Sequence, residues 1–183
     1  MLQKVSKLAA VMAVATVMTS ASSLFVQVNS SQTFTVAVGS DLSVTPPSGG
    51  NAILAPDQTD SNQDFAAGGT DVDWHVLSNS GNGATISFAN DGLFTNTIGP
   101  NVYTRNLYFE IVETSVPSGV WAVSGSPNFT SSSLSPTATL QSTSTGQGNA
   151  SFAVNARFID NNYSLLPAGT YVMTITGTVS ANP

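Results

Sequence analysis

The chain of 183 residues contains no cysteine. Disulfide cross-links, thiol catalysis and cysteine-based metal sites are therefore excluded together. The fold must be stabilised by a hydrophobic core instead. A chain of this length can bury enough apolar surface for one domain of that kind.

Long apolar runs are also missing. The longest run, Leu8–Met18, covers about ten residues, whereas a transmembrane helix needs about twenty. It follows two lysines and precedes the small residues Thr19–Ser23, which is the pattern of a secretory signal peptide. We therefore predict a cleaved signal peptide over residues 1–23 and one exported domain over residues 24–183, with no membrane span. An uncleaved anchor is the alternative.

Charged residues make up only 8% of the chain, and two of the four basic residues lie in the predicted signal peptide. Its removal leaves Arg105 and Arg157 against ten acidic residues, a net charge of about −8, and no lysine. Such a surface repels phosphate backbones, so we expect no nucleic-acid partner. Ser, Thr, Asn, Gln and Gly must cover the surface, which is a composition typical of extracellular β proteins.

Apolar residues alternate with polar ones along most of the chain, which is the period of a β-strand with one buried face. The clearest example is Tyr171–Ser180, in which Tyr171, Met173 and Ile175 share a face and threonines occupy the other. We predict further strands at Leu24–Val28, Gln32–Val38, Asp41–Thr45, Asp71–Leu77, Ala84–Phe88, Arg105–Val112, Val120–Val123, Thr137–Gln141 and Asn149–Ile159. The residues between Ser48 and Gly69 predict a long loop.

Two connections predict hairpins. A turn cluster at Ser78–Gly83 would join the strands on either side of it, and Asp160–Gly169 would join the last two strands of the chain. No helical period of 3.6 residues is sustained after the signal peptide. The sequence therefore predicts an all-β fold, a two-sheet antiparallel sandwich with immunoglobulin-like or jelly-roll connections.

The closing stretch Leu166–Ser180 contains Leu-Pro-Ala-Gly-Thr-Tyr followed by alternating threonines. It resembles the closing strand of bacterial surface and pilus-like β-sandwich proteins, of the spore-coat-U/secreted-pilin type and of the WxL type. The resemblance implies an exported structural or adhesive sandwich. It transfers no functional residues, because the disulfide usual in the pilin types is absent and Gly177-Thr178-Val179 stands where a WxL domain would place Trp-x-Leu.

An acidic stretch supplies the best candidate for a metal site, because carboxylate and amide oxygens are the ligands that Ca²⁺ prefers. The candidate ligands are Asp57, Asp60, Asn62, Asp64, Asp71 and Asp73. Four of them occupy the first, third, fifth and twelfth positions of an EF-hand-like loop. However, Phe65 stands where glycine makes the turn, and the twelfth residue is aspartate instead of glutamate. These mismatches favour the alternative, a solvated polar loop.

Other candidate sites are weaker. His75 could act as base to a serine, but the sequence has no Gly-x-Ser-x-Gly motif, so a solvated surface histidine is the favoured alternative. Glu110 and Glu113 are three residues apart on one predicted strand. They should point to opposite faces and not form a glycosidase pair. Four aromatic rings would form a sugar-binding platform if exposed and part of the core if buried: Trp74, Trp121, Tyr103 and Tyr108.

Two functional hypotheses follow. The first is a secreted, non-enzymatic structural protein, a surface, matrix or fibre subunit whose partners are copies of itself or other surface proteins. In it, Leu24–Val38 would pair within its own subunit or complement the sheet edge of a neighbour. The second is an extracellular carbohydrate-binding or adhesin module that binds glycans, with calcium in the acidic stretch. We expect no enzyme, because no catalytic constellation is visible.

Overall fold

The computed structural model describes residues 32–38, 41–48, 52–53, 58–65, 72–116, 121–160 and 162–183. The chain divides into two units, Met1–Ala37 and Val38–Pro183, and every strand of the described residues lies in the second unit. The domain predicted over residues 24–183 contains the whole of this unit. The predicted signal peptide and the strand predicted at Leu24–Val28 lie outside the described residues.

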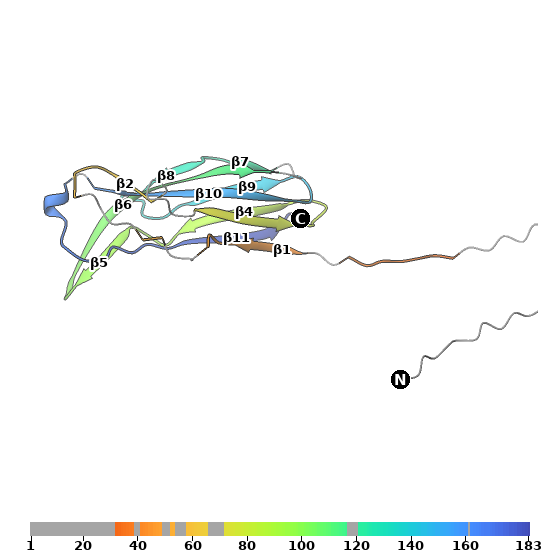
Figure 1. Ribbon diagram of the computed structural model, residues 1–183, viewed down its shortest axis with the longest axis horizontal. Helices are drawn as coiled ribbons and strands as arrows, with labels where there is room; N and C mark the ends of the chain where they lie inside the picture. Colours follow the sequence, from red (N-terminus) through yellow and green to blue (C-terminus); the bar gives the residue numbers. More distant parts are fainter. Residues whose placement is uncertain are drawn as a thin grey trace, which may run out of the picture. The chain divides into compact units, whose positions relative to one another are not determined.

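The second unit is all-β and consists of two antiparallel sheets, so the predicted two-sheet architecture is confirmed (Figure 1). The large sheet contains β1 (Leu42–Thr45), β2 (Gln63–Asp64), β3 (Asp73–Ser78), β5 (Phe94–Ile98), β6 (Asn101–Ser115), β8 (Asn128–Thr130) and β10 (Gly148–Ile159). The small sheet contains β4 (Ala84–Asn90), β7 (Trp121–Ser124), β9 (Thr139–Ser144) and β11 (Ile175–Ala181).

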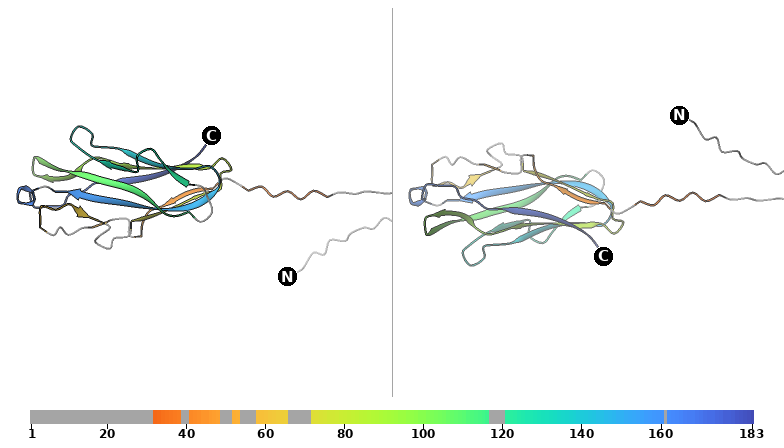
Figure 2. Two further views of the ribbon diagram at one scale, coloured as in Figure 1. Left: turned by 90° about the horizontal axis from the view of Figure 1, so that it is seen from above. Right: turned by 90° about the horizontal axis from the view of Figure 1, so that it is seen from below.

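The order of the strands in each sheet differs from their order in the chain. The large sheet runs β1-β3-β10-β6-β5, with β2 paired to β10 and β8 paired to β6. The small sheet runs β11-β4-β9-β7. Figure 2 shows β6 and β10, the long green and blue strands, side by side in the large sheet. A 3-10 turn at Tyr163–Leu165 lies on the way to β11, and no described helix is long and apolar enough to cross a membrane.

The core lies between the sheets because each long strand buries alternate side chains. On β4 the buried residues include Ile86 and Phe88, and on β6 they are Leu107, Phe109 and Ile111. Four aromatic rings join the two layers in a row of edge-to-face contacts, the geometry that aromatic quadrupoles favour. The centroid distances are 5.5 Å for Trp74–Phe88, 5.9 Å for Phe88–Phe152 and 5.8 Å for Phe152–Trp121.

Both predicted hairpins are wrong. The strands expected on either side of Ser78–Gly83 do form, as β3 and β4, but they lie in different sheets. The last two strands, β10 and β11, are separated in the same way. Alternation buries one face of a strand whether its sequence neighbour pairs beside it or faces it across the core. The contact between Trp74 of β3 and Phe88 of β4 shows that these two strands face each other.

The predicted strand at Gln32–Val38 is also wrong. These residues have no regular secondary structure, and Phe34, Val36 and Val38 are 83%, 85% and 82% exposed. A period of two indicates which face of a strand can be buried, but a strand forms only when another strand pairs with it. No strand of the described residues pairs with this segment.

The long loop predicted between Ser48 and Gly69 is wrong in part, because β2 lies inside it. Gln63 of β2 is 8% exposed and pairs with Phe158 of β10. The ring of Phe65 then stacks on Phe94 at a centroid distance of 5.9 Å. A polar segment is held against the large sheet by these two contacts, which connect residues far apart in the sequence.

The side-chain amide of Asn90 is buried and links two distant segments of this cysteine-free chain. The side chain of Asn90 donates hydrogen bonds to the carbonyl oxygens of Gly92 and Pro136, both at 2.8 Å, and accepts one from the Ala138 amide at 2.7 Å. Asn90 is only 4% exposed. Because a buried polar group needs partners, these three bonds fix the end of β4 against the segment that leads into β9.

Candidate functional site

Four of the six candidate calcium ligands lie among the described residues, and two of these have partners in distant parts of the chain. Asp60 is exposed, and its Oδ1 accepts a hydrogen bond from the Tyr163 amide at 2.7 Å. Asp64 forms an ion pair with Arg157, with 2.7 Å between Oδ2 and Nε. Asn62 is exposed, and Asp73 begins β3. These positions reflect partners from distant parts of the chain, which the sequence does not reveal.

No group of three or more His, Cys, Asp or Glu side chains that could hold a metal ion occurs among the described residues. Asp57 and Asp71, however, lie outside the described residues. Calcium binding by the acidic stretch therefore stays a prediction. In the described part, Asp64 acts as the partner of an arginine.

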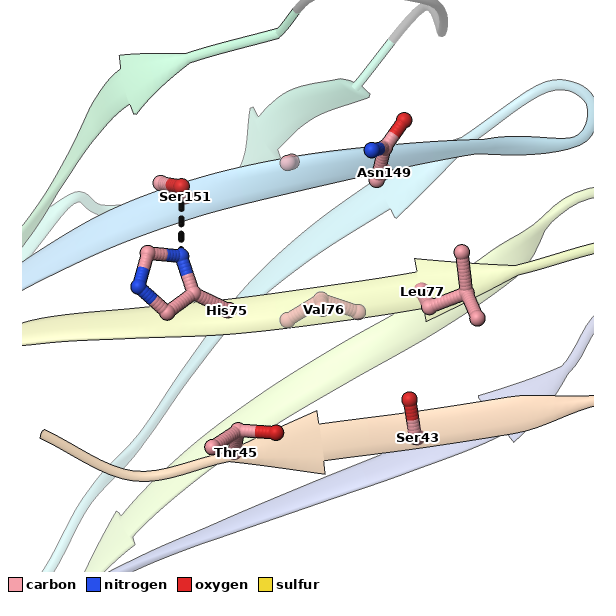
Figure 3. A pocket seen from close by; sticks show the side chains of 8 residues that line it. Ser43, Thr45, His75, Val76, Leu77, Asn149 and Ser151 are labelled. Carbon is pink, nitrogen blue, oxygen red and sulfur yellow. Dashed lines mark hydrogen bonds between the residues drawn. The ribbon is translucent and has the colours of Figure 1, made fainter.

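A shallow polar depression of about 340 Å³ lies on the outer face of the large sheet (Figure 3). Ser43 and Thr45 come from β1, His75 and Leu77 from β3, and Asn149 and Ser151 from β10. His75 Nδ1 lies 2.8 Å from Ser151 Oγ, which is hydrogen-bonding distance. A histidine base and a serine nucleophile could be arranged at this distance, but catalysis also needs a group that orients the histidine. Among the described residues, no carboxylate bonds to the other ring nitrogen, so the pair lacks the orienting group of a catalytic triad there.

The proposed aromatic platform does not form. Trp121 is 4% exposed and Trp74 packs against the core, so the core alternative is correct for both tryptophans. Tyr103 and Tyr108 are half-buried on β6. The guanidinium carbon of Arg157 lies 5.1 Å from the centroid of the Tyr108 ring, so this ring already has a cation on it.

Glu110 and Glu113 point to opposite sides of the large sheet, as predicted. Glu110 accepts a hydrogen bond from the Tyr108 hydroxyl at 2.7 Å and one from the Asn155 side chain at 3.3 Å. Glu113 instead accepts one from Ser142 of the small sheet at 3.2 Å. The two carboxylates therefore cannot act together on one bond, and Glu110 belongs to a surface network with Tyr108 and Arg157.

This network predicts a decline of stability at alkaline pH. The hydrogen bond to Glu110, with burial adding to it, raises the pKa of Tyr108 above its ordinary value of 10.0. Above about pH 10 the unfolded chain releases the proton before the folded one does, so stability present below that pH is lost as the pH rises. Denaturant unfolding between pH 8 and pH 11 should show this decline in the parent and a smaller one in Tyr108→Phe.

Tyr163→Phe is the matched control, since it removes a tyrosine hydroxyl but leaves the Tyr108–Glu110 bond in place. It should decline with pH as the parent does. A Tyr108→Phe variant that loses stability as steeply as the parent would show that the bond has no part in the pH dependence.

An apolar groove of about 880 Å³ opens in the second unit near the end of β1, and the sequence did not predict it. Its lining includes Trp74, Phe94, Val154, Ala156, Phe158 and Met173. β1 pairs with β3 only from Leu42 to Thr45. Pro46 and Pro47 follow, and proline has no N–H for a strand ladder. The groove thus lies where the edge strand stops.

One wall of the apolar groove is the segment Tyr171–Thr174, which leads into β11. On one side, Val172 exchanges two backbone hydrogen bonds with Thr95, and the Thr174 carbonyl accepts one from the Asp91 amide at 3.0 Å. On the other side, the backbone groups of Tyr171 and Met173 have no partner among the described residues. No described strand is therefore paired to this edge of the wall.

Of the patterns in the sequence, the alternation of apolar and polar residues over Tyr171–Ser180 is the one that includes part of the apolar groove. It correctly predicted that Tyr171, Met173 and Ile175 pack on the core side. It could not show that β1 ends at Thr45, next to the residues that line the apolar groove. Comparison with protein-family models, with curated proteins and with solved structures found no match to this chain.

Proposed function

We propose that this chain is an exported, non-enzymatic structural protein, a surface, matrix or fibre subunit that associates with copies of itself. The observation that supports this most directly is the exposed face of Gln32–Val38. Phe34, Val36 and Val38 each leave more than four-fifths of their surface in solvent. Several large apolar side chains exposed in one short segment are typical of an interaction site.

The composition supports the same proposal. The predicted signal peptide directs the chain out of the cell, and the remaining residues carry few charges and no lysine. A cysteine-free sandwich that relies on an aromatic core needs no oxidising step to fold. Such a molecule suits a role in which many copies are exported and then associate.

Size-exclusion chromatography with light scattering tests the proposal on the exported chain, at several protein concentrations, with and without Ca²⁺. We expect oligomers whose mass rises with protein concentration. A monomer at every concentration would contradict self-association. Glycan-array binding by that monomer would then favour the alternative, a carbohydrate-binding or adhesin module. A change of elution or melting temperature on adding Ca²⁺ would support the calcium prediction for the acidic stretch.

A further inference from the structure

We propose that the apolar groove binds a neutral long-chain lipid, such as a fatty alcohol or a fatty-acid ester, by its hydrocarbon chain. This inference goes beyond the proposed function and does not depend on self-association. The described residues that line the groove all lie in the second unit, Val38–Pro183, so the site is formed by one part of one copy.

The size and the lining of the groove are those of a ligand site. Its volume of about 880 Å³ lies within the range of small-molecule pockets, about 300 to 1,000 Å³, which are mostly apolar with a few polar groups. The polar side chains in this lining include Gln63, Tyr163 and Thr170. No Asp, Glu, Lys, Arg or His is among the described residues that line the groove. Such a lining suits an apolar ligand.

Four aromatic rings follow one another along the lining. Phe65 stacks on Phe94 with an angle of 6° between the ring planes. Phe158 then contacts Phe94 at an angle of 61° and Tyr171 at an angle of 75°. Rings inclined in this way offer no common plane on which a sugar or a flat ring system could stack. A flexible hydrocarbon chain needs no such plane.

The floor and the wall of the groove also suit a hydrocarbon chain. Val154, Ala156 and Phe158 recur at every second residue of β10, so the floor extends about 13 Å along this strand. Met173 on the wall has an unbranched, polarizable side chain, which adapts to the irregular shape of an apolar ligand. An extended chain laid along the floor would therefore have apolar contacts over its whole length.

The charges around the groove favour a neutral ligand. Asp60 and Asp91 lie at its rim, because their carboxylates accept hydrogen bonds from the backbone amides of two lining residues, at 2.7 Å and 2.9 Å. Arg105 and Arg157 are each ion-paired with another aspartate. A fatty-acid carboxylate would therefore meet acidic groups and no unpaired arginine among the described residues. An alcohol or ester head group adds no charge and would stay in water at the rim.

Tryptophan fluorescence tests the proposal, because the chain has two tryptophans and one of them, Trp74, lines the groove. Trp121→Phe leaves Trp74 as the only tryptophan. The indole N–H of Trp121 has no hydrogen-bond partner among the described residues, so this substitution removes no described hydrogen bond. The exported chain is titrated with dodecanol that carries bromine at the far end of its chain, since bromine quenches an indole that it touches. We expect saturable quenching that unlabelled dodecanol reverses.

Two substitutions in this background should weaken the quenching. Ala156→Phe fills the floor, and its control is Ala122→Phe at an exposed position on β7. Met173→Asp places a charge on the wall, and its control is Val102→Asp at an exposed position on β6. Excluding about two methylene groups from the groove weakens binding by about tenfold, so each groove variant should need at least about ten times more probe than its control. Melting curves identify the variants that fold, and either groove variant that folds is sufficient.

Absence of saturable quenching in the Trp121→Phe chain would overturn the proposal. So would equal quenching in a folded groove variant and its control. Brominated dodecanoate tests the class of ligand: it should bind several-fold more weakly than the alcohol at low salt, and the difference should shrink as salt screens the charges. Equal binding of the two probes at low salt would overturn the assignment to a neutral lipid. Chromatography without lipid measures self-association separately, so the failure of one proposal leaves the other in place.

Discussion

Replacing Phe88 with alanine is expected to lower the free energy of unfolding by about 4 kcal/mol, the range for a fully buried phenylalanine. Phe88 has no exposed surface and comes from the middle of β4. Its ring contacts Trp74 and Phe152, both from the large sheet, at 5.5 Å and 5.9 Å. The substitution would leave a cavity at the point where the two sheets interlock, in a fold that has no disulfide to limit the loss.

Chemical denaturation of Phe88→Ala beside the parent measures this effect. Val102→Ala is the control, because Val102 is an apolar β6 residue that is 62% exposed, and its loss should cost about 0.5 kcal/mol or less. If Phe88→Ala lost no more than Val102→Ala, the aromatic row would not hold the sheets together. A chain that no longer folds would be consistent with the expected direction, and Phe88→Leu then supplies a measurable intermediate.

Gly177→Val should lower the free energy of unfolding by about 3 kcal/mol, because it overfills a closely packed site. Gly177 lies on β11 and pairs with Phe88 of β4. A Cβ at this position would stand 2.8 Å from Cζ3 of Trp74 and 3.0 Å from its Cε3. The indole of Trp74 is large and rigid and is already packed against Phe88, so it cannot move away without opening the core.

The matched control is Gly81→Val, since a Cβ at Gly81 would meet no atom within 4 Å. Its melting temperature should stay near that of the parent. In Gly177→Val/Trp74→Leu the smaller side chain makes room for the valine, so the double variant should lose less than the sum of the two single losses. Strict additivity would show that Gly177 and Trp74 do not compete for space.

The strands were predictable because period-two alternation reports burial directly. Ala150, Phe152 and Val154 on β10 are buried as expected, and so are Leu107 and Phe109 on β6. The pairing of strands was not predictable. A strand shows the same alternation whether it pairs beside its neighbour in the sequence or faces that neighbour across the core. Both hairpin predictions were wrong for this reason. Sheet order depends on contacts such as Trp74–Phe88, between residues of different strands.

The candidate sites show the same limit. Asp60 and Asp64 are close in sequence, but their partners are the Tyr163 amide and Arg157, which lie a hundred residues or so further along the chain. The apolar groove was not predictable because it results from the early end of β1 and collects residues from several distant segments. For Gln32–Val38, the sequence revealed an apolar face but not whether a partner exists within the same chain.

The strand order also limits when this chain can fold during its synthesis. β4 lies between β9 and β11, so its two partners emerge long after it does. β3 pairs with β1 on one side but waits for β10 on the other, and among the described strands only β5 and β6 are both consecutive in the chain and paired. A ribosome adds about 5–20 residues per second, so β4 waits several seconds for β11. Non-local pairing of this kind is slow, and the edge of β4 that pairs with β11 stays open until β11 has been made.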